Sequence, residues 1–303
     1  MRAGTEPKVS IVVVNWNGRD VIRPCLESLQ QLTYPRLEIV VVDNASTDGS
    51  IEAIEASPGV RLVRNHENLG FPRACNRGIA ETGGEYVLLL NNDTVADRPR
   101  VLDTTVAFME EHEDAGALGV RLRNEDGSLQ ISCAYFPDLA AEVRNSLPAR
   151  LVLGPGSPRW YTEADHERTR PVDWVMGAFL LLRRAALEEA GAFDERIFMY
   201  ADDYDLCYRL RLKGWRTYFL ASTSITHRFD WSKTFADDER AVEVDRAERS
   251  ILAKHRGRTY ARAFALFVVA DRWSKLVVAI LLGRRETARK LRAELRARIR
   301  ALA

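Results

Sequence analysis

Cysteine is scarce in this sequence, and its four cysteines are far apart. Cys25, Cys75, Cys133 and Cys207 stand at least 50 positions from one another, and no C-x-x-C pair occurs. Zinc sites and disulfide frameworks use closely or regularly spaced cysteines, so the sequence indicates neither. The simpler interpretation is reduced thiols in a cytoplasmic protein.

Long hydrophobic runs are also missing. The two longest apolar stretches near the end, residues 263–270 and 276–282, are separated by charged residues that include Asp271 and Lys275. A membrane-spanning helix needs about 20 consecutive apolar residues. Residues 1–8 are short and polar, unlike a secretory signal. We therefore expect a cytoplasmic protein, soluble or attached peripherally to the inner face of the cell membrane.

Glycine-rich phosphate-binding motifs are absent as well. The sequence contains neither G-x-x-x-x-G-K-[ST] nor a G-x-G-x-x-G that follows a strand-like run. ATP-binding loops and dinucleotide-binding folds depend on these motifs, so both classes lose their main support. Any phosphate-bearing ligand must be held by other groups.

Charge of one sign is not in excess overall, but it is unevenly distributed. Residues 256–300 carry 13 Lys or Arg against 3 Asp or Glu, a net charge of +10, whereas the remainder carries 31 against 40. With 46% hydrophobic residues, the 303-residue chain can bury a large core. We expect a main domain over residues 1–255 and a basic, amphipathic helical region over 256–303.

Four strand-like runs occur in the first third, and each is followed by polar residues. The runs are residues 9–14, 37–42, 60–63 and 86–90, followed respectively by Asn15-Trp16-Asn17, Asp43-Asn44, Arg64-Asn65 and Asn91-Asn92-Asp93. Helical patterns begin near Asp20 and Ser50, between these runs. Alternating strands and helices predict right-handed βαβ units, and hence an α/β fold with a mostly parallel sheet flanked by helices.

The polar strand ends are expected to meet at one edge of the sheet. In open sheets of parallel strands, ligands bind at the carboxyl ends of the strands. Asn, Asp and Ser also form ordinary turns and helix caps, which explains any single strand end equally well. Four on one edge favour a site. Its carboxylates and amides suit a nucleotide held through base and ribose, with phosphates bound through a divalent cation.

Seven motifs, in order along residues 8–235, carry a family resemblance. They are VSIVVVNWN (9–17), VVDNASTDG (41–49), NLGF (68–71), LLNND (89–93), VMGA (175–178), FDE (193–195) and YADDYDLCYRL (200–210). Together they resemble the family 2 inverting glycosyltransferases, which have the GT-A fold, and most closely the rhamnosyltransferase-like branch of bacterial surface polysaccharide synthesis. The resemblance implies transfer of a sugar from a nucleoside-diphosphate sugar, with dTDP-rhamnose or a UDP-sugar favoured, to a glycan or lipid-linked acceptor.

The resemblance implies roles for residues of the donor site. Asn15, Trp16, Asp43 and Asn44 would line the base and ribose pocket, and Arg73 would lie near the base or the diphosphate. These assignments predict that the donor nucleotide binds across the ends of the first two strands.

A metal site is implied at the end of the fourth strand. Asn91-Asn92-Asp93 occupies the place of the family's D-x-D motif, so Asp93 would contact the cation while Asn91 and Asn92 meet the diphosphate. Asn91 replaces the first acid, so diphosphate oxygens and waters would complete the coordination of Mg²⁺ or Mn²⁺. His227 stands where a family histidine reaches the metal, although a lone histidine is more often structural.

The segment after His227 departs from the family pattern. H-x-x-G-x-S occurs with Asp230 where glycine is usual, and glycine permits backbone angles that aspartate adopts less readily. Arg228, Ser232 and Lys233 would contact phosphate.

Asp202 and Asp203 are the candidate catalytic acids. Acids in the first turn of a helix also favour the helix dipole, so a purely structural role explains them as well. The resemblance places Asp203 at the general base and Asp202 at the neighbouring acid, which is usually Glu. Asp203 would accept the proton of the acceptor hydroxyl while the cation neutralises the departing nucleoside diphosphate, without a covalent intermediate.

The acceptor side is predicted from the middle of the chain. Residues 121–171 show little periodicity and predict a flap over the acceptor. We then expect a strand beneath the acceptor site that contains Trp174, Gly177 and Ala178, although Trp174 fits core packing equally well.

Alternatives remain for the partner of the C-terminal region and for the function of the whole protein. The basic helices of residues 256–303 fit a membrane surface or a second subunit, and without a recognisable module they do not indicate nucleic-acid binding. A sugar nucleotidyltransferase would share such a sheet but needs a glycine- and arginine-rich phosphate loop after its first strand. A non-catalytic sugar-nucleotide-binding protein would keep the fold and could lose Asp93 or Asp203, both of which are present.

Overall fold

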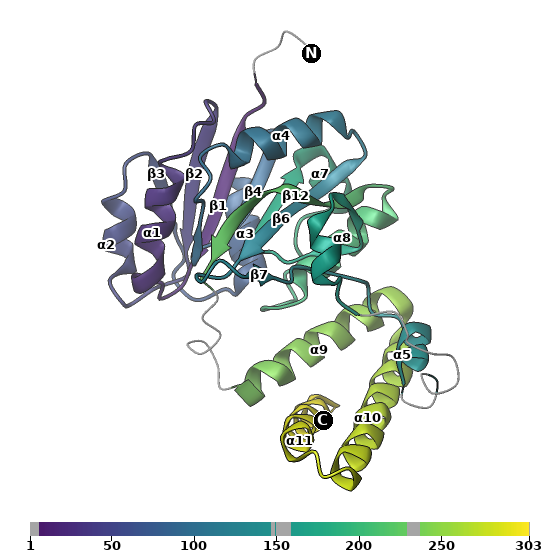
Figure 1. The fold of residues 1–303 in the computed structure, drawn as a ribbon. Helices are drawn as coiled ribbons and strands as arrows, with labels where there is room; N and C mark the ends of the chain where they lie inside the picture. The colour runs from purple at the N-terminus through teal and green to yellow at the C-terminus, as the bar shows by residue number, and fades with distance from the viewer. Residues whose placement is uncertain (1–5, 147–148, 150–158, 229–236, 303) are drawn as a thin grey trace. The chain divides into compact units, whose positions relative to one another are not determined.

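Figure 1 shows the fold in a computed structural model of the chain, which describes residues 6–146, 149, 159–228 and 237–302. The strands are β1 Val9–Asn15, β2 Leu37–Asp43, β3 Val60–Arg64, β4 Tyr86–Asn91, β5 Thr94–Val95, β6 Ala115–Arg123, β7 Leu129–Gln130, β8 Cys133–Ala134, β9 Arg170–Val172, β10 Trp174–Val175, β11 Phe179–Arg183 and β12 Arg216–His227. The helices are α1 Arg19–Leu29, α2 Ser50–Glu55, α3 Phe71–Ala80, α4 Val101–Glu111, α5 Leu139–Asn145, α7 Arg184–Ala190, α8 Asp202–Leu212, α9 Asp237–Arg256, α10 Arg258–Leu281 and α11 Arg285–Leu302, with a 3₁₀ helix over Glu163–Glu167.

The chain divides into two compact units. The first contains Met1–Tyr135, Trp160–Phe198 and Asp202–Phe229, and the second contains Phe136–Arg159, Met199–Ala201 and Asp230–Ala303. Helix α9 ends at Arg256, so the predicted boundary after residue 255 falls at the end of a helix. Independent folding of residues 1–255 stays a prediction.

A twisted sheet forms the centre of the first unit, with strand order β3-β2-β1-β4-β11-β6-β12-β5. The strands β3, β2, β1 and β4 are parallel, as the βαβ pattern predicts. Beyond them the sheet is mixed, because β11 runs antiparallel to both β4 and β6 whereas β12 runs parallel to β6. The α/β class is therefore confirmed, and the antiparallel strands belong to the second half of the sheet.

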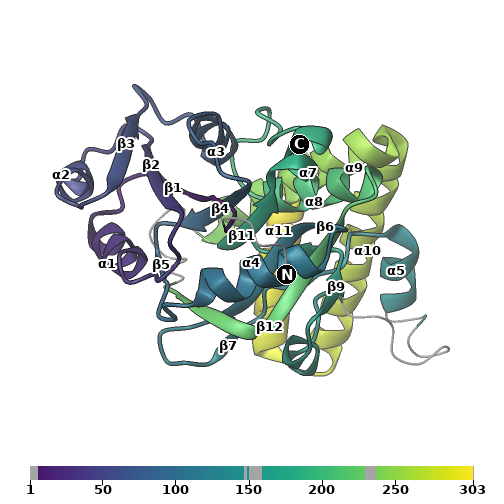
Figure 2. The ribbon, with the colours of Figure 1, turned by 90° about the horizontal axis from the view of Figure 1, so that it is seen from above.

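Helices cover both faces of this sheet (Figure 2). Side chains alternate along β1, so that Ile11 and Val13 pack with α1, α2 and α4, whereas Val12 packs with α3, α7 and α8. Gly78 lets α3 approach the sheet, since a Cβ there would collide with Val12. Each of the four predicted strands ends one residue later than expected, so Asn15, Asp43, Arg64 and Asn91 belong to the ladder itself.

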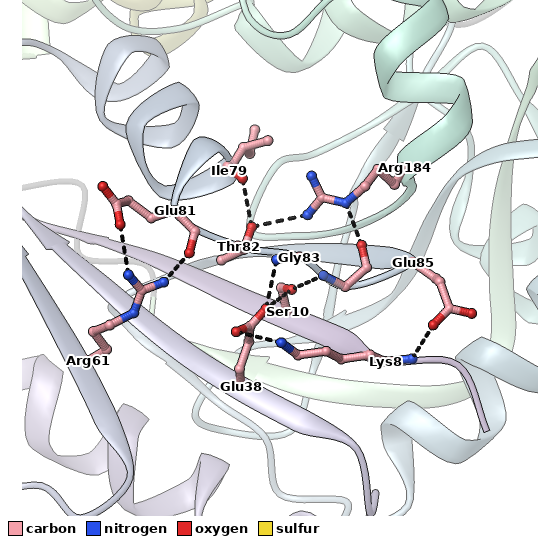
Figure 3. A network of polar contacts seen from close by, with 11 residues as sticks. Lys8, Ser10, Glu38, Arg61, Ile79, Glu81, Thr82, Gly83, Glu85 and Arg184 are labelled. Carbon is pink, nitrogen blue, oxygen red and sulfur yellow. Dashed lines mark hydrogen bonds and ion pairs between the residues drawn. The ribbon is translucent and has the colours of Figure 1, made fainter. Parts of the chain in front are cut away.

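A polar network ties the starts of β1, β2 and β4 together, as Figure 3 shows. Glu38 accepts hydrogen bonds from Ser10 at 2.5 Å and from the Gly83 N–H at 3.0 Å, and it pairs with Lys8 at 2.8 Å. Burial by itself raises the pKa of Glu38, but the contacts with Lys8, Ser10 and Gly83 outweigh it and lower the pKa to about 2. The network fixes the edge of the sheet opposite Asn15 and leaves the other edge for a site.

Replacing Glu38 by glutamine is expected to lower the free energy of unfolding by about 1–2 kcal/mol at pH 7, because charge-assisted hydrogen bonds are lost. The folded-state pKa lies below the ordinary value, so the carboxylate stabilises fully above about pH 4.5, and this stabilisation is lost as the pH falls towards 2. Urea unfolding at pH 7 and pH 3 measures the difference, with Glu27→Gln on the exposed side of α1 as the control. A Glu38→Gln deficit that is unchanged at pH 3 would contradict the assignment.

The second unit is helical, as predicted for the C-terminal region. Helices α9, α10 and α11 pack on one another in the yellow and green part of Figure 1. Phe264 and Val268 form the core of α10 with α9, and Leu276 does so with Leu295 of α11. Among the described residues, every helix falls short of the length or the hydropathy that a membrane crossing requires.

Residues 121–171 contain more structure than the predicted flap. Strands β7, β8 and β9, helix α5 and the 3₁₀ helix lie there, whereas Gly154 to Pro158 fall outside the described residues. Strands of two or three residues are too short to produce a periodic pattern, which explains why the sequence did not indicate them. A role at the acceptor site stays a prediction.

Candidate active site

The polar ends of β1, β2 and β4 meet at one edge, as the strand pattern predicts. Asn15 lies opposite Asp43 in the parallel ladder, and Val14 lies opposite Asn91. Asn15 and Asp43 are fully buried. Polar groups at the end of a ladder must be hydrogen-bonded when they are buried, so their partners define the shape of this edge.

The Asn15 side chain joins these strand ends. Its Nδ2 donates to Asp43 Oδ1 at 2.9 Å and to Ser50 Oγ at 2.9 Å, while its Oδ1 accepts from Asn92 Nδ2 at 2.9 Å. One amide thus contacts the end of β2, the start of α2 and the turn after β4. A satisfied network of this kind rigidifies the floor of a binding site.

Asp43 and Asn44 are also held by protein groups outside β1. Ser46 donates through its N–H and its hydroxyl to the two oxygens of Asp43, at 2.9 and 2.6 Å. Asn44 donates to the Gly70 carbonyl at 3.2 Å and accepts from Asn65 at 2.6 Å. These contacts hold both side chains in fixed orientations, whereas Trp16, at 39% exposure, presents an open aromatic surface.

Backbone strain occurs next to these strand ends. Asn17 and Ala45 have φ values of 50° and 60°, in the left-handed region that residues with a Cβ rarely adopt. Tyr200 and Ala201, which immediately precede α8, have φ values of 70° and 59°. Strain of this kind persists where the surrounding structure imposes it, and it is concentrated at functional sites.

Asp93 and His227 form the candidate metal pair. Asp93 Oδ1 lies 3.2 Å from His227 Nε2, and the Asp93 carbonyl accepts from the Arg228 N–H at 2.8 Å. The antiparallel pairing of β5 with β12 brings them together, since His227 lies opposite Thr94. Two residues 134 positions apart therefore share one end of the sheet.

The orientation of the His227 ring supports a cation at this pair. Nδ1 lies 2.7 Å from Gln130 Oε1, and donation to that amide oxygen leaves a lone pair on Nε2. Among the described residues, Asp93 Oδ1 is inaccessible and accepts no hydrogen bond, so with this tautomer two electron-rich atoms face each other. A proton or a metal ion between them relieves the repulsion. Carboxylate oxygen and imidazole nitrogen are both ligands of Mn²⁺ sites, so these residues fit the predicted group.

The protein supplies a small ligand set here. No group of three or more His, Cys, Asp or Glu in the described part of the chain could hold a metal ion. Asn91 stands where the family has an acid, and its Nδ2 lies 3.4 Å from His227 Nε2. Diphosphate oxygens and waters would have to complete the coordination, as Mg²⁺ permits.

Asp203 lies at the start of α8 and is partly accessible. Its Oδ2 accepts from the Gly177 N–H at 2.9 Å, and its Oδ1 accepts from the Tyr204 N–H at 2.8 Å. Burial raises the pKa of Asp203 to about 6 against these hydrogen bonds, which lower it. A carboxylate with such a pKa is ionised at neutral pH yet basic enough to accept a proton. Its neighbour Asp202 is buried.

The segment Gly177–Ala178 connects the Asp203 side of the site to the strand ends. The Gly177 N–H holds the Asp203 carboxylate, and the Ala178 carbonyl accepts from the Asn91 N–H at 3.2 Å. Two residues therefore separate the candidate base from the end of β4, which carries Asn91. The structure brings the two predicted halves of the site together.

Aromatic side chains surround Trp174. The Trp174 ring meets Trp160 edge to face at 5.3 Å between centroids and lies 6.4 Å from the Tyr204 ring. Its Nε1 donates to the Tyr135 carbonyl at 3.3 Å, and Trp160 is 38% exposed. Rings that are partly exposed and fixed in this way suit stacking on a sugar. The predicted acceptor role of Trp174 stays a prediction.

The residues predicted to contact phosphate, and Arg73, are held by other protein groups or lie outside the described residues. Arg73 is exposed on α3 and donates from Nε to the Glu195 carbonyl at 3.1 Å. Arg228 Nε lies 2.9 Å from a Glu125 oxygen. Ser232 and Lys233 lie outside the described residues.

Three residues of this site have no distinctive sequence signal. Gln130, which orients His227, lies in a two-residue strand, and Ser46 and Ser50 resemble ordinary turn residues. Only the tertiary structure shows their contacts. Trp160 could have been suspected as a tryptophan in a polar segment.

Comparison with known proteins defines the class of protein. The mannosyltransferase PcManGT from Pyrobaculum calidifontis matches 98% of this chain and 86% of its own, with a TM-score of 0.65 and 18% identity. A structure of GalNAc-T7 matches 80% of this chain and 48% of its own, with a TM-score of 0.58 and 15% identity. At these identities the likeness shows the fold alone, and the fold is of the GT-A type.

The sequence relatives define the family. Residues 10–191 match the family model described as Glycosyl transferase family 2, and the chain belongs to this family. It is 34% identical over 268 residues, 82% of each chain, to the N-acetylglucosaminyl-diphospho-decaprenol L-rhamnosyltransferase of Mycobacterium tuberculosis. It is 26% identical over 227 residues to the rhamnosyltransferase WbbL of Escherichia coli, covering 72% of this chain and 83% of that protein. The resemblance seen in the motifs is confirmed.

Proposed function

We propose that this protein moves a sugar, with inversion, from a nucleoside-diphosphate sugar to a hydroxyl of a glycan or lipid-linked acceptor. The observation that carries the proposal is the short link through Gly177–Ala178 between the Asp203 carboxylate and the Asn91 end of β4. The name of the mycobacterial relative specifies an L-rhamnosyl group and a diphospho-decaprenol acceptor. This supports dTDP-rhamnose as the favoured donor, with a UDP-sugar as the alternative.

Asp203 is the general base of the proposed reaction. The Gly177 N–H fixes one carboxylate oxygen, and the raised pKa makes the group a good proton acceptor near neutral pH. It takes the proton from the acceptor hydroxyl as that oxygen attacks the anomeric carbon, while the bond to the nucleoside diphosphate breaks on the opposite face. Asp202 is the neighbouring acid. A positioned base contributes about 10²- to 10⁴-fold in rate.

Asp93 and His227 would hold the divalent cation, Mg²⁺ or Mn²⁺. When bound, the ion offsets the negative charge that develops on the departing diphosphate. The PcManGT and GalNAc-T7 structures contain Mn²⁺, which supports a divalent ion in this fold. Gln130 keeps His227 oriented towards Asp93.

The remaining site residues bind substrates in the proposed reaction. The donor base and ribose occupy the pocket of Asn15, Trp16, Asp43 and Asn44 beside Arg73, and the diphosphate meets Asn91 and Asn92. The acceptor lies against Trp174, Gly177 and Ala178. Arg228, Ser232 and Lys233 contact phosphate oxygens. The protein would act in the cytoplasm, on the inner face of the cell membrane where the acceptor is lipid-linked.

The rate is expected to depend on pH through Asp203. Because only the ionised carboxylate accepts a proton, kcat/KM should be level near pH 7 and should fall about tenfold per pH unit below about 6. Initial rates at low donor concentration between pH 5 and pH 8 measure this profile. A profile that stays level down to pH 4.5 would show that Asp203 is not the base.

Product analysis tests the proposed function. Purified protein is supplied with dTDP-rhamnose or a UDP-sugar, Mn²⁺ and a pyrophosphate-linked N-acetylglucosamine lipid, and the nucleoside diphosphate is measured with and without acceptor. Acceptor-dependent release and inverted anomeric configuration support the proposal. Release of pyrophosphate from nucleoside triphosphate and sugar phosphate would identify a nucleotidyltransferase, and donor binding without turnover would identify a non-catalytic binding protein.

A further inference from the structure

The second unit carries a basic pocket that the proposed reaction does not use. A cavity of about 380 Å³ lies where α9 and α10 meet the end of α11. Its lining includes Arg246 and Arg249 of α9, Arg258 and Arg262 of α10, and the apolar side chains of Ala261 and Leu302. Four arginines thus line one small space.

These four arginines form no close ion pair within the described part of the chain, although Arg249 attracts the Asp245 carboxylate at longer range. None of them has a carboxylate at ion-pair distance there, because the buried acids of α9 are held by other arginines. Asp245 pairs with Arg298, and Glu248 pairs with Arg159. Clustered guanidinium groups repel one another, and a bound anion relieves that repulsion. The planar fork of arginine matches phosphate oxygens in particular.

An exposed apolar stripe continues from this pocket along α10. Leu266, Trp273 and Ile280 are 61%, 60% and 48% exposed, and the seven-residue spacing places all three on one face of the helix. Arg262 lies one turn before Leu266 on that face. Phe264 and Val268 occupy the buried face, so core packing does not require the stripe.

We propose that the arginine pocket binds the phosphate group of an anionic lipid while the α10 stripe lies in the adjoining apolar layer of the membrane surface. Charge complementarity selects this occupant, because residues 256–300 carry a net charge of +10. A second copy of the chain would bring like charges together. A nucleic-acid backbone would leave the stripe exposed. The proposal does not depend on the sugar-transfer reaction.

Vesicle binding by the full-length protein tests the pocket. Phosphatidylcholine vesicles with and without phosphatidic acid are used as probes in co-sedimentation. The double variant Arg249→Gln/Arg262→Gln is expected to bind the acidic vesicles about tenfold or more weakly. The control Arg289→Gln/Arg292→Gln removes the same charge from exposed positions of α11 and should lose less than about threefold. Equal losses in both variants would show diffuse attraction and overturn the pocket.

Further experiments distinguish an anionic lipid from the other possible ligands of the pocket and the stripe. Inorganic pyrophosphate is added as a competitor for the arginine pocket in the same vesicle assay. Trp273→Ser should weaken vesicle binding but leave the affinity for pyrophosphate unchanged, because only the stripe is altered. Binding of free pyrophosphate without vesicle binding, tighter binding of a single-stranded oligonucleotide, or a dimer that Leu266→Ser dissociates would each overturn the lipid assignment. If the first double variant fails to fold by circular dichroism, Arg246→Gln/Arg258→Gln takes its place. Asp203→Asn should bind vesicles as the parent protein does, so that a failure of lipid binding can be told apart from a failure of the proposed reaction.

Discussion

Asp203→Asn is expected to lower kcat by about 10²- to 10⁴-fold while donor affinity changes little. The substitution is isosteric, and its single amide oxygen can still accept one of the two backbone N–H bonds that position this side chain, from Gly177 or from Tyr204. What is lost is the ability to take a proton, because an amide is not a base at neutral pH. Steady-state kinetics with saturating donor and acceptor give kcat, and titration calorimetry with the nucleotide sugar gives donor affinity.

A matched aspartate shows that the effect is local. Asp97 is exposed beyond β5, so Asp97→Asn should keep the activity of the parent protein. If Asp203→Asn turned over at the parental rate, the proton would leave by another route, and Asp202 would be the next residue to test. If it lost donor affinity instead, Asp203 would be a binding residue.

Asp93→Asn is expected to lower activity by about 10²-fold or more and to abolish the response of the protein to Mn²⁺. The substitution keeps the shape of the side chain but removes the charge opposite His227 Nε2. A divalent ion contributes several kcal/mol of charge stabilisation to such reactions, and about 2.7 kcal/mol corresponds to 10²-fold. Activity and melting temperature are measured with and without Mn²⁺ and donor, and chelation of the parent protein should reproduce the loss.

The companion variant Gln130→Ala tests the orientation of the histidine. Without the Gln130 oxygen at 2.7 Å, the His227 ring can present either nitrogen to Asp93, so Mn²⁺ affinity should fall about 10- to 100-fold. Full activity of Asp93→Asn in the presence of chelator would remove the metal from the mechanism. If Asp93→Asn lost the response to Mn²⁺ and also melted at a lower temperature than the parent protein without Mn²⁺, the pair would have a structural role instead.

Much of the fold could be predicted because it depends on local pattern. The alternation of short apolar runs with helical segments predicted β1 to β4, α1 and α2 with small errors in their ends, whereas α3 was not predicted. Strands of two residues, such as β7, contain too little sequence for a pattern, and β11 gives no sign that it inserts antiparallel between β4 and β6. Strand order is set by packing across the whole sheet, which no local window records.

The candidate site divides in the same way. Asn15, Asp43 and Asp93 could be located because they stand where buried strands end, and Asp203 through its motif. The contacts of Gln130 with His227 and of Gly177 with Asp203 join residues that are 97 and 26 positions apart. Such pairs depend on strand register and helix placement, so sequence spacing does not predict them.

The sequence by itself determined the α/β class, the family and the chemical types at the sheet edge, since these depend on residue order and strand ends. The tertiary structure alone decided that Asp93 faces His227, that Gly177–Ala178 spans from the Asp203 carboxylate to β4, and that four arginines of α9 and α10 surround one cavity. The physical reason is that a charged group acquires its pKa, its ligands and its partners from neighbours in space, and the fold chooses those neighbours.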